Sequence, residues 1–167
     1  MLTVDGIPAH PLVIHAVVVI LPLAAAGTVL VAARPVWRRQ LGPWVLLLAV
    51  IGVAGVPISQ RTGAQLAESL GGGSPLVAIH AERASTLLLP AVLYLLLLIA
   101  TLALGRRADA PAGDGPGAAH ALATRTASGT AQRVTLIVGV LAALAGIVVT
   151  GLVVWIGHAG ATAVWTS

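Results

Sequence analysis

Four of the five histidines lie at the ends of long apolar runs. His10 and His15 fall within the stretch GIPAHPLVIH at the start of one run, His80 precedes another, and His158 follows a third. Imidazole nitrogens bind haem iron axially, and they also bind zinc and copper(II). These four histidines are therefore the candidate ligands for a haem or for a metal ion.

The other residue types limit that chemistry. The chain has no cysteine and one methionine, which excludes disulfides, iron–sulfur ligation, thiolate metal sites and soft copper(I) chemistry. Glu82 is a candidate oxygen ligand beside His80, and Arg61 and Arg83 are candidate partners for haem propionates. No nucleophile motif of the G-x-S-x-G kind occurs, so we assign no catalytic residue and expect no catalytic activity of the chain's own.

The elements that must position these residues are membrane-spanning helices. Hydrophobic residues make up 58% and charged residues 8% of the 167 residues, and the mean hydropathy is +1.02. At about 1.5 Å per residue, each apolar run can cross a hydrocarbon core of about 30 Å. We predict an all-α, integral membrane four-helix bundle, antiparallel and up-down-up-down, in one domain over 1–167. Its spans are 11–33, 41–59, 75–104 with a protruding start, and 134–158.

The connections between the spans differ in kind. The short segment Arg34–Gln40 predicts an antiparallel hairpin of the first two helices. Residues 105–132, which contain His120 and are rich in Ala, Gly, Pro and Thr, predict a flexible inner linker. Ser74 and Pro75 predict the start of the third helix, because serine favours the N-cap position and proline the first turn.

The arginines predict the orientation, since basic connections are retained on the cytoplasmic side. All nine basic residues are arginines; seven lie in the first and third connections, and only Arg61 and Arg83 lie elsewhere. We therefore predict N-out and C-out topology, as a multi-pass protein of the bacterial cytoplasmic membrane in contact with the lipid bilayer. The arginines serve as anchors and form no basic face interleaved with aromatic residues, which argues against nucleic acid. No charged residue lies mid-span, which argues against a transporter.

Helical periodicity suggests how the histidines point. Steps of three and four residues from His15 and from His158 follow stripes that contain small residues, which favour close helix packing. We expect both side chains to point into the bundle, where His10 and His80 would join them in a polar chamber at the outer end. The stripes are Val18, Val19, Pro22, Ala26 and Gly27 in the first helix, and Val154, Gly151, Thr150, Ile147, Gly146 and Ala142 in the last.

Three motifs resemble a known family. GIPAHPLVIH followed by Pro22-Leu23, HAE at His80–Glu82 followed by Leu88-Leu89-Pro90, and IGHAGATAVW at Ile156–Trp165 resemble the bacterial predicted membrane proteins grouped as the domain of unknown function numbered twenty-two thirty-one, and most of all their short actinobacterial members. The resemblance implies a four-helix membrane protein with His10, His15, His80 and His158 as motif histidines, and no settled activity. Some relatives are joined to a Rieske-type iron–sulfur domain. The chain departs from the pattern at Ala159 and Thr162, and at Arg83-Ala84-Ser85.

Three classes of function remain open. The first is an accessory electron-transfer module that binds haem b between two of the histidines, with His15 and His158 as the first choice, and serves a membrane redox complex or a Rieske-type protein. The scarcity of aromatic residues in the spans, where Tyr94 is the exception, argues against a haem pocket. The second is a zinc or copper(II) site built from His10, His15, His80, His158 and Glu82. The third is a cofactor-free structural or assembly protein. The sequence does not give the oligomeric state.

Overall fold

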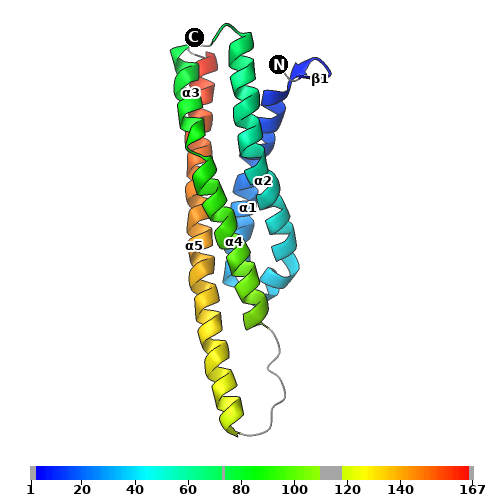
Figure 1. Cartoon of the computed structure of the whole chain (residues 1–167), viewed down its shortest axis with the longest axis vertical. Coiled ribbons are helices and arrows are strands. Elements are labelled where there is room, and N and C mark those ends of the chain that lie inside the picture. The colour runs from blue at the N-terminus through cyan, green and yellow to red at the C-terminus, as the bar shows by residue number, and fades with distance from the viewer. Residues whose placement is uncertain (1–2, 73, 110–117, 166–167) are drawn as a thin grey trace.

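The structure is a computed structural model that describes residues 3–72, 74–109 and 118–165, and the side chains of these apart from Val4, 118–128 and 163–165. His120 and Trp165 are therefore described only by their backbone, and the part of the predicted linker at 110–117 lies outside the described residues. The elements, in chain order, are β1 (Thr3–Val4), β2 (Ile7–Pro8), α1 (Ala9–Ala33), α2 (Pro35–Ser69), α3 (Pro75–Ser85), α4 (Leu88–Ala108) and α5 (Ala118–Trp165) (Figure 1).

Four helical segments of the described chain are long and apolar enough to cross a membrane. They are Ala9–Ala33, Pro35–Ser69, Pro75–Ala108 and Gly129–Thr162, the third of which joins α3 to α4. They run antiparallel and pack against one another (Figure 1). The predicted all-α membrane four-helix bundle is confirmed, while its orientation in the membrane stays a prediction.

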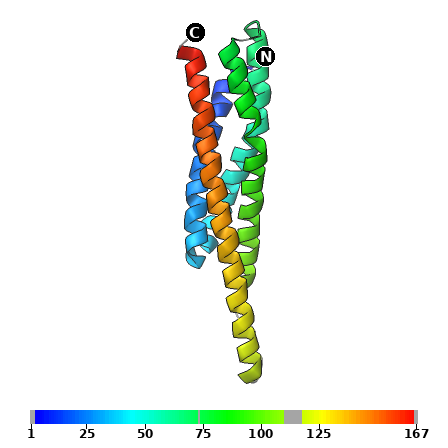
Figure 2. The same cartoon turned by 90° about the vertical axis from the view of Figure 1, so that its left-hand side faces the viewer.

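The helices pack in a ring around the bundle axis. α1 packs against α2 and α5, and both α3 and α4 pack against α5 and α2. This places α1 diagonally opposite α3 and α4. Both chain ends lie at one end of the bundle, which we call the histidine end because His10, His80 and His158 lie there; the opposite end, with Arg34, Arg38, Arg39 and Arg106, is the arginine end. The first part of α5 extends beyond the other helices at the arginine end (Figure 2).

A short hairpin precedes α1. β1 and β2 pair antiparallel, with Thr3 opposite Pro8. The turn residues Asp5 and Gly6 have φ values of 49° and 80°, the left-handed conformations that a two-residue type I′ turn requires. This hairpin, which was not predicted from the sequence, leads the chain directly into α1.

The connection between α1 and α2 is shorter than predicted. Arg34 alone is extended, with φ −141° and ψ 133°, and Pro35 opens α2. A residue before proline disfavours the helical conformation, whereas proline itself suits the first turn of a helix. The helix therefore restarts at once, and the rest of the predicted connection to Gln40 belongs to α2.

α2 continues well beyond its predicted end at Ser59. It ends at Ser69, where Gly71 and Gly72 adopt φ values of 86° and 97°. The N–H of Gly72 donates to the carbonyl of Ala67 at 2.9 Å, as in glycine-terminated helix ends. The last turns of α2 thus rise beside α3 at the histidine end (Figure 1).

The third predicted helix is broken and the predicted linker is partly helical. α3 ends at Ser85 and α4 begins at Leu88; Pro90 has no N–H to offer the carbonyl of Thr86, which accounts for a break at this point. Residues 105–108 and 118–132 are helical, in contrast to the flexible linker predicted over 105–132. Alanine, the strongest helix former, is frequent in this segment and favours the helix.

A single aromatic residue crosses the centre of the bundle. Tyr94 of α4 is fully buried, and its hydroxyl lies 2.8 Å from Thr28 Oγ1 of the diagonally opposite α1. Because Thr28 Oγ1 donates to the carbonyl of Ala24 at 2.9 Å, Tyr94 is the donor to Thr28. Gly146 of α5 makes room for the ring, since a Cβ there would lie 3.2 Å from Tyr94 Cε2. The polar contact at mid-bundle therefore depends on a glycine.

Candidate functional site

His10 docks α1 onto α2 at the histidine end. Its half-buried imidazole donates from Nδ1 to the carbonyl of Ser59 at 3.0 Å, and Thr62 Oγ1 lies 3.3 Å from the same nitrogen. The ring lies against Gly63, where an added Cβ would approach its Cε1 to 3.0 Å. The extension of α2 beyond Ser59 therefore creates the surface that holds His10.

His80 repeats the same arrangement on the other pair of helices. Its Nδ1 donates to the carbonyl of Ile156 on α5 at 3.1 Å. The ring lies against Gly160, where an added Cβ would come within 3.0 Å of Cε1. In both cases the glycine follows the accepting carbonyl by four residues, one helical turn on. If the ring of helices is followed in one direction, each histidine docks on the helix that comes next: His10 of α1 docks on α2, and His80 of α3 docks on α5.

These hydrogen bonds determine which nitrogen of each ring carries a proton. A backbone carbonyl only accepts, so Nδ1 of both His10 and His80 must donate. In the neutral ring, Nε2 then presents a lone pair, and no hydrogen bond to either Nε2 occurs within the described part of the chain. Imidazoles that ligate metals are held in this way, with the other ring N–H on a carbonyl or carboxylate.

The two docked histidines lie across the bundle from each other. α1 and α3 are diagonal partners, each packed between α2 and α5. Two half-buried imidazoles with the same hydrogen-bonding state therefore lie on diagonal helices at the histidine end.

His15 and His158 point outward, contrary to prediction. Both side chains are exposed, and His15 Nδ1 donates to the carbonyl of Pro11 on its own helix. Most of the predicted stripe residues are exposed as well, among them Val19 at 62% and Val154 at 66%. The buried face of α1 instead follows Val17, Leu21, Ala24, Ala25, Thr28 and Val31. α1 and α5 are apolar on all sides, so periodicity could not separate the lipid-facing side from the packed side.

The remaining predicted site residues lie near the histidine end without joining the pair. The guanidinium of Arg83 lies over the ring of Trp155, 4.5 Å from its centroid, and so ties α3 to α5. Arg61 and Glu82 are exposed. Among the described residues, no three histidine or carboxylate side chains come together as metal ligands would. Of the predicted set, the structure thus docks His10 and His80 on neighbouring helices in the same way.

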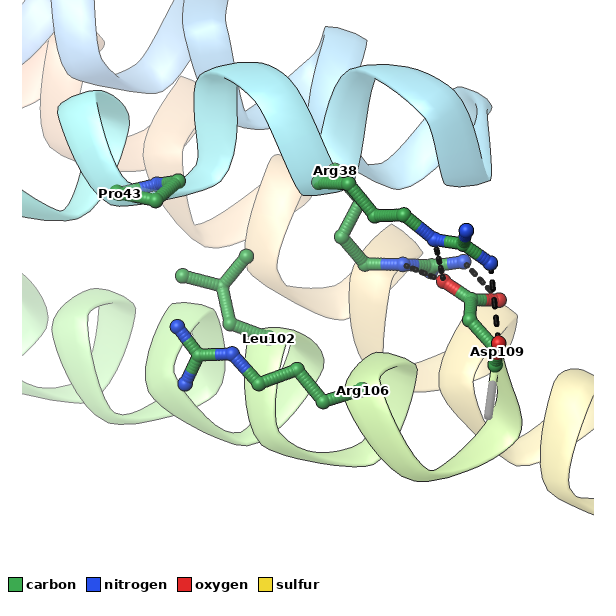
Figure 3. Close-up of a pocket in the computed structure, with 6 residues that line it drawn as sticks. Arg38, Pro43, Leu102, Arg106 and Asp109 are labelled. Carbon is green, nitrogen blue, oxygen red and sulfur yellow. Dashed lines mark hydrogen bonds and ion pairs between the residues drawn. The ribbon is translucent and has the colours of Figure 1, made fainter. Parts of the chain in front are cut away.

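A second polar site, not predicted from the sequence, lies at the arginine end between α2 and α4 (Figure 3). Asp109 accepts from Arg38 Nε at 3.4 Å and Nη2 at 3.5 Å, and its main-chain carbonyl accepts from Arg39 Nη2 at 3.0 Å. Both Arg38 and Asp109 are buried, with side chains 8% and 7% exposed. These residues line a hollow of about 300 Å³ with Pro43, Leu102 and Arg106. The sequence does contain a signal for this site, because Asp109 closely follows Arg106 and Arg107 at the end of an apolar run.

One comparison with known proteins identifies related chains. The family model described as "Predicted membrane protein (DUF2231)" matches residues 6–167. No curated protein and no solved structure matches the chain. The matched range includes all four candidate spans, both docked histidines and the hollow at the arginine end.

Proposed function

We propose that the chain, which belongs to this family of membrane proteins and is matched over nearly its whole length, is an accessory electron-transfer module that binds haem b between His10 and His80. The observation that supports the proposal is the matched pair of half-buried imidazoles on diagonal helices, each with Nδ1 committed to a backbone carbonyl. Two axial imidazoles from facing helices are the ligand set of a haem b in a helical bundle.

The donor set favours haem over a zinc or copper(II) site. Protein sites for zinc use three or four protein ligands, and the described residues bring no three candidate ligands together. A haem with two axial imidazoles requires only two protein ligands. The carbonyl of Ser59 and the carbonyl of Ile156 would fix the orientation of the two rings, and Gly63 and Gly160 would keep them seated on the neighbouring helices. The iron of a bound haem would supply the one-electron chemistry.

The histidine end carries two further features that suit a haem. Arg61 is exposed there and Arg83 is stacked on Trp155, so at least one guanidinium is available to an anionic propionate. The core next to this end is apolar and contains Val17, Val56, Leu87 and Val153. An apolar surrounding restricts water, which is one of the means by which a protein adjusts the reduction potential of its haem. A membrane redox complex or a Rieske-type protein is the partner that this function implies.

A haem titration of the purified full-length protein tests the proposal. We expect one haem bound per chain with a low-spin bis-histidine spectrum. The variants His10→Ala and His80→Ala should each abolish that spectrum, whereas His15→Ala and His158→Ala, which change exposed imidazoles of the same end, should keep it. Loss of the spectrum in His15→Ala or His158→Ala with retention in the first two would contradict the proposed ligand pair.

A cofactor-free assembly protein is the second candidate, and the docking contacts themselves favour it. His10 ties α1 to α2 and His80 ties α3 to α5 without any added group. In that case neither wild type nor variants would bind haem after reconstitution, yet His10→Ala and His80→Ala would still lower the unfolding temperature in detergent. Haem binding and haem-free stability, measured on the same four variants, therefore separate the two functions.

A further inference from the structure

The hollow between α2 and α4 at the arginine end is lined mainly by cationic side chains. Three guanidinium groups, those of Arg38, Arg39 and Arg106, line it together with one carboxylate, that of Asp109. The hollow therefore carries two positive charges in excess. Asp109 is shared between Arg38 and Arg39, so its single negative charge does not satisfy both.

Arg106 lies in the hollow without an acidic partner. Its guanidinium extends beside Leu102 and away from Asp109, toward the side of α2 that bears Pro43 (Figure 3). No carboxylate pairs with it among the described residues. The guanidinium of Arg39 contacts Asp109, but it also reaches solvent, since the side chain is 64% exposed. The two exposed cations come from different helices and border the same hollow.

Packing holds the floor of the hollow in place. Gly105 has no side chain, and the aliphatic stem and guanidinium of Arg38 occupy the space where its Cβ would be. Gly42 similarly gives room to Leu102, whose Cδ2 would lie 2.7 Å from an added Cβ. The buried Arg38–Asp109 pair therefore forms a fixed polar wall, while Pro43 and Leu102 form an apolar wall beside it.

We propose that this hollow binds the headgroup of a phospholipid with two phosphates, of the cardiolipin type, through Arg39 and Arg106. A lipid fits better than a free anion because the hollow combines guanidinium groups with the apolar surface of Pro43 and Leu102. The exposed side chain of Trp44 lies one residue beyond Pro43, and tryptophan favours the headgroup level of a bilayer. Basic pockets between membrane helices bind such headgroups, and two phosphates match the excess of two positive charges.

Native mass spectrometry of the full-length protein, titrated with cardiolipin and with phosphatidylcholine, tests this site. Each arginine near a membrane surface contributes enough attraction that removing two should weaken cardiolipin binding roughly tenfold or more. We expect that loss in Arg39→Gln combined with Arg106→Gln, and a loss of about fivefold in Arg106→Gln alone. Arg107→Gln removes one charge, as Arg106→Gln does, but from the neighbouring position outside the hollow, and should retain binding. The variants Arg39→Lys and Arg106→Lys, which keep the charge, should retain most of the preference.

Two results would overturn the proposal. One is an equal loss of cardiolipin binding in Arg107→Gln and in Arg106→Gln, which each remove one charge, because this would show that only the total charge matters. The other is displacement of cardiolipin by millimolar inorganic phosphate, with equal phosphate binding to lipid-free protein, which would assign the hollow to a free anion. Circular dichroism of each variant should match wild type, because the three substituted side chains, Arg39, Arg106 and Arg107, are exposed.

Discussion

Removing the carboxylate of Asp109 should destabilise the bundle far more than removing an exposed acid. In the variant Asp109→Asn the buried guanidinium of Arg38 would lose its only charged partner within the described chain, while the shape of the side chain is kept. Opposite charges at 3.4 Å attract by about 4 to 5 kcal/mol at an effective dielectric constant near 20. Part of this attraction is offset in the wild type by the desolvation of both groups.

The size of this loss in unfolding free energy follows from the burial of the Arg38–Asp109 pair and from the lengths of its hydrogen bonds. Breaking a buried ion pair by removing one partner costs about 3 to 5 kcal/mol. The two hydrogen bonds from Arg38 are long, at 3.4 and 3.5 Å, and the hollow lies beside the pair, so we expect the lower end of this range, about 3 kcal/mol. Arg38→Gln should cost a similar amount. Arg39→Gln should cost less than about 1 kcal/mol, because an exposed partner contributes little.

Unfolding by sodium dodecyl sulfate in mixed micelles, followed by far-ultraviolet circular dichroism, measures these free energies. Glu82→Gln is the matched control, since it removes one exposed acid at the histidine end and should leave stability unchanged. The reasoning would be refuted if Asp109→Asn unfolded with the same free energy as Glu82→Gln. It would equally be refuted if Arg39→Gln cost as much as Arg38→Gln.

Three further predictions concern the core, the histidine end and the topology. Tyr94→Phe should lower stability by about 0.6 to 1.5 kcal/mol, because Thr28 keeps its bond to a backbone carbonyl; a loss above 3 kcal/mol in the same unfolding assay would contradict this account. Gly160→Ala should displace the ring of His80, since the added Cβ would lie 3.0 Å from it, and should weaken haem binding in a titration; unchanged binding would argue against the docked geometry. A reporter protein fused after Gln40 should lie on the cytoplasmic side of the membrane. A reporter found on the outer side would contradict the predicted orientation.

The number and approximate position of the spans could be predicted because length and apolar composition alone specify them. The boundaries were harder, since they depend on single residues. Pro35 restarts a helix directly after Arg34, and Gly71 and Gly72 end one well past the apolar run. The break before Leu88 was not predicted, because a proline inside a helix can either bend the helix or interrupt it. Here Pro90 interrupts it.

The rotation of each helix could not be predicted. Val17 is buried while Val18 and Val19 are exposed, although the three side chains are identical, because lipid and protein interior are equally apolar surroundings. For this reason the sequence favoured His15 and His158 over His10 and His80. The glycines that seat the docked rings, Gly63 and Gly160, are visible in the sequence, but their partners are known only once the helices are packed.

The most direct test of the proposed function is the dithionite-reduced minus oxidised absorption spectrum of the detergent-purified protein, recorded for wild type, His80→Ala and His158→Ala. The proposal predicts a reduced α band and a shifted Soret band in wild type and in His158→Ala, and neither band in His80→Ala. Wild-type protein that shows no such bands after reconstitution with haem would contradict it.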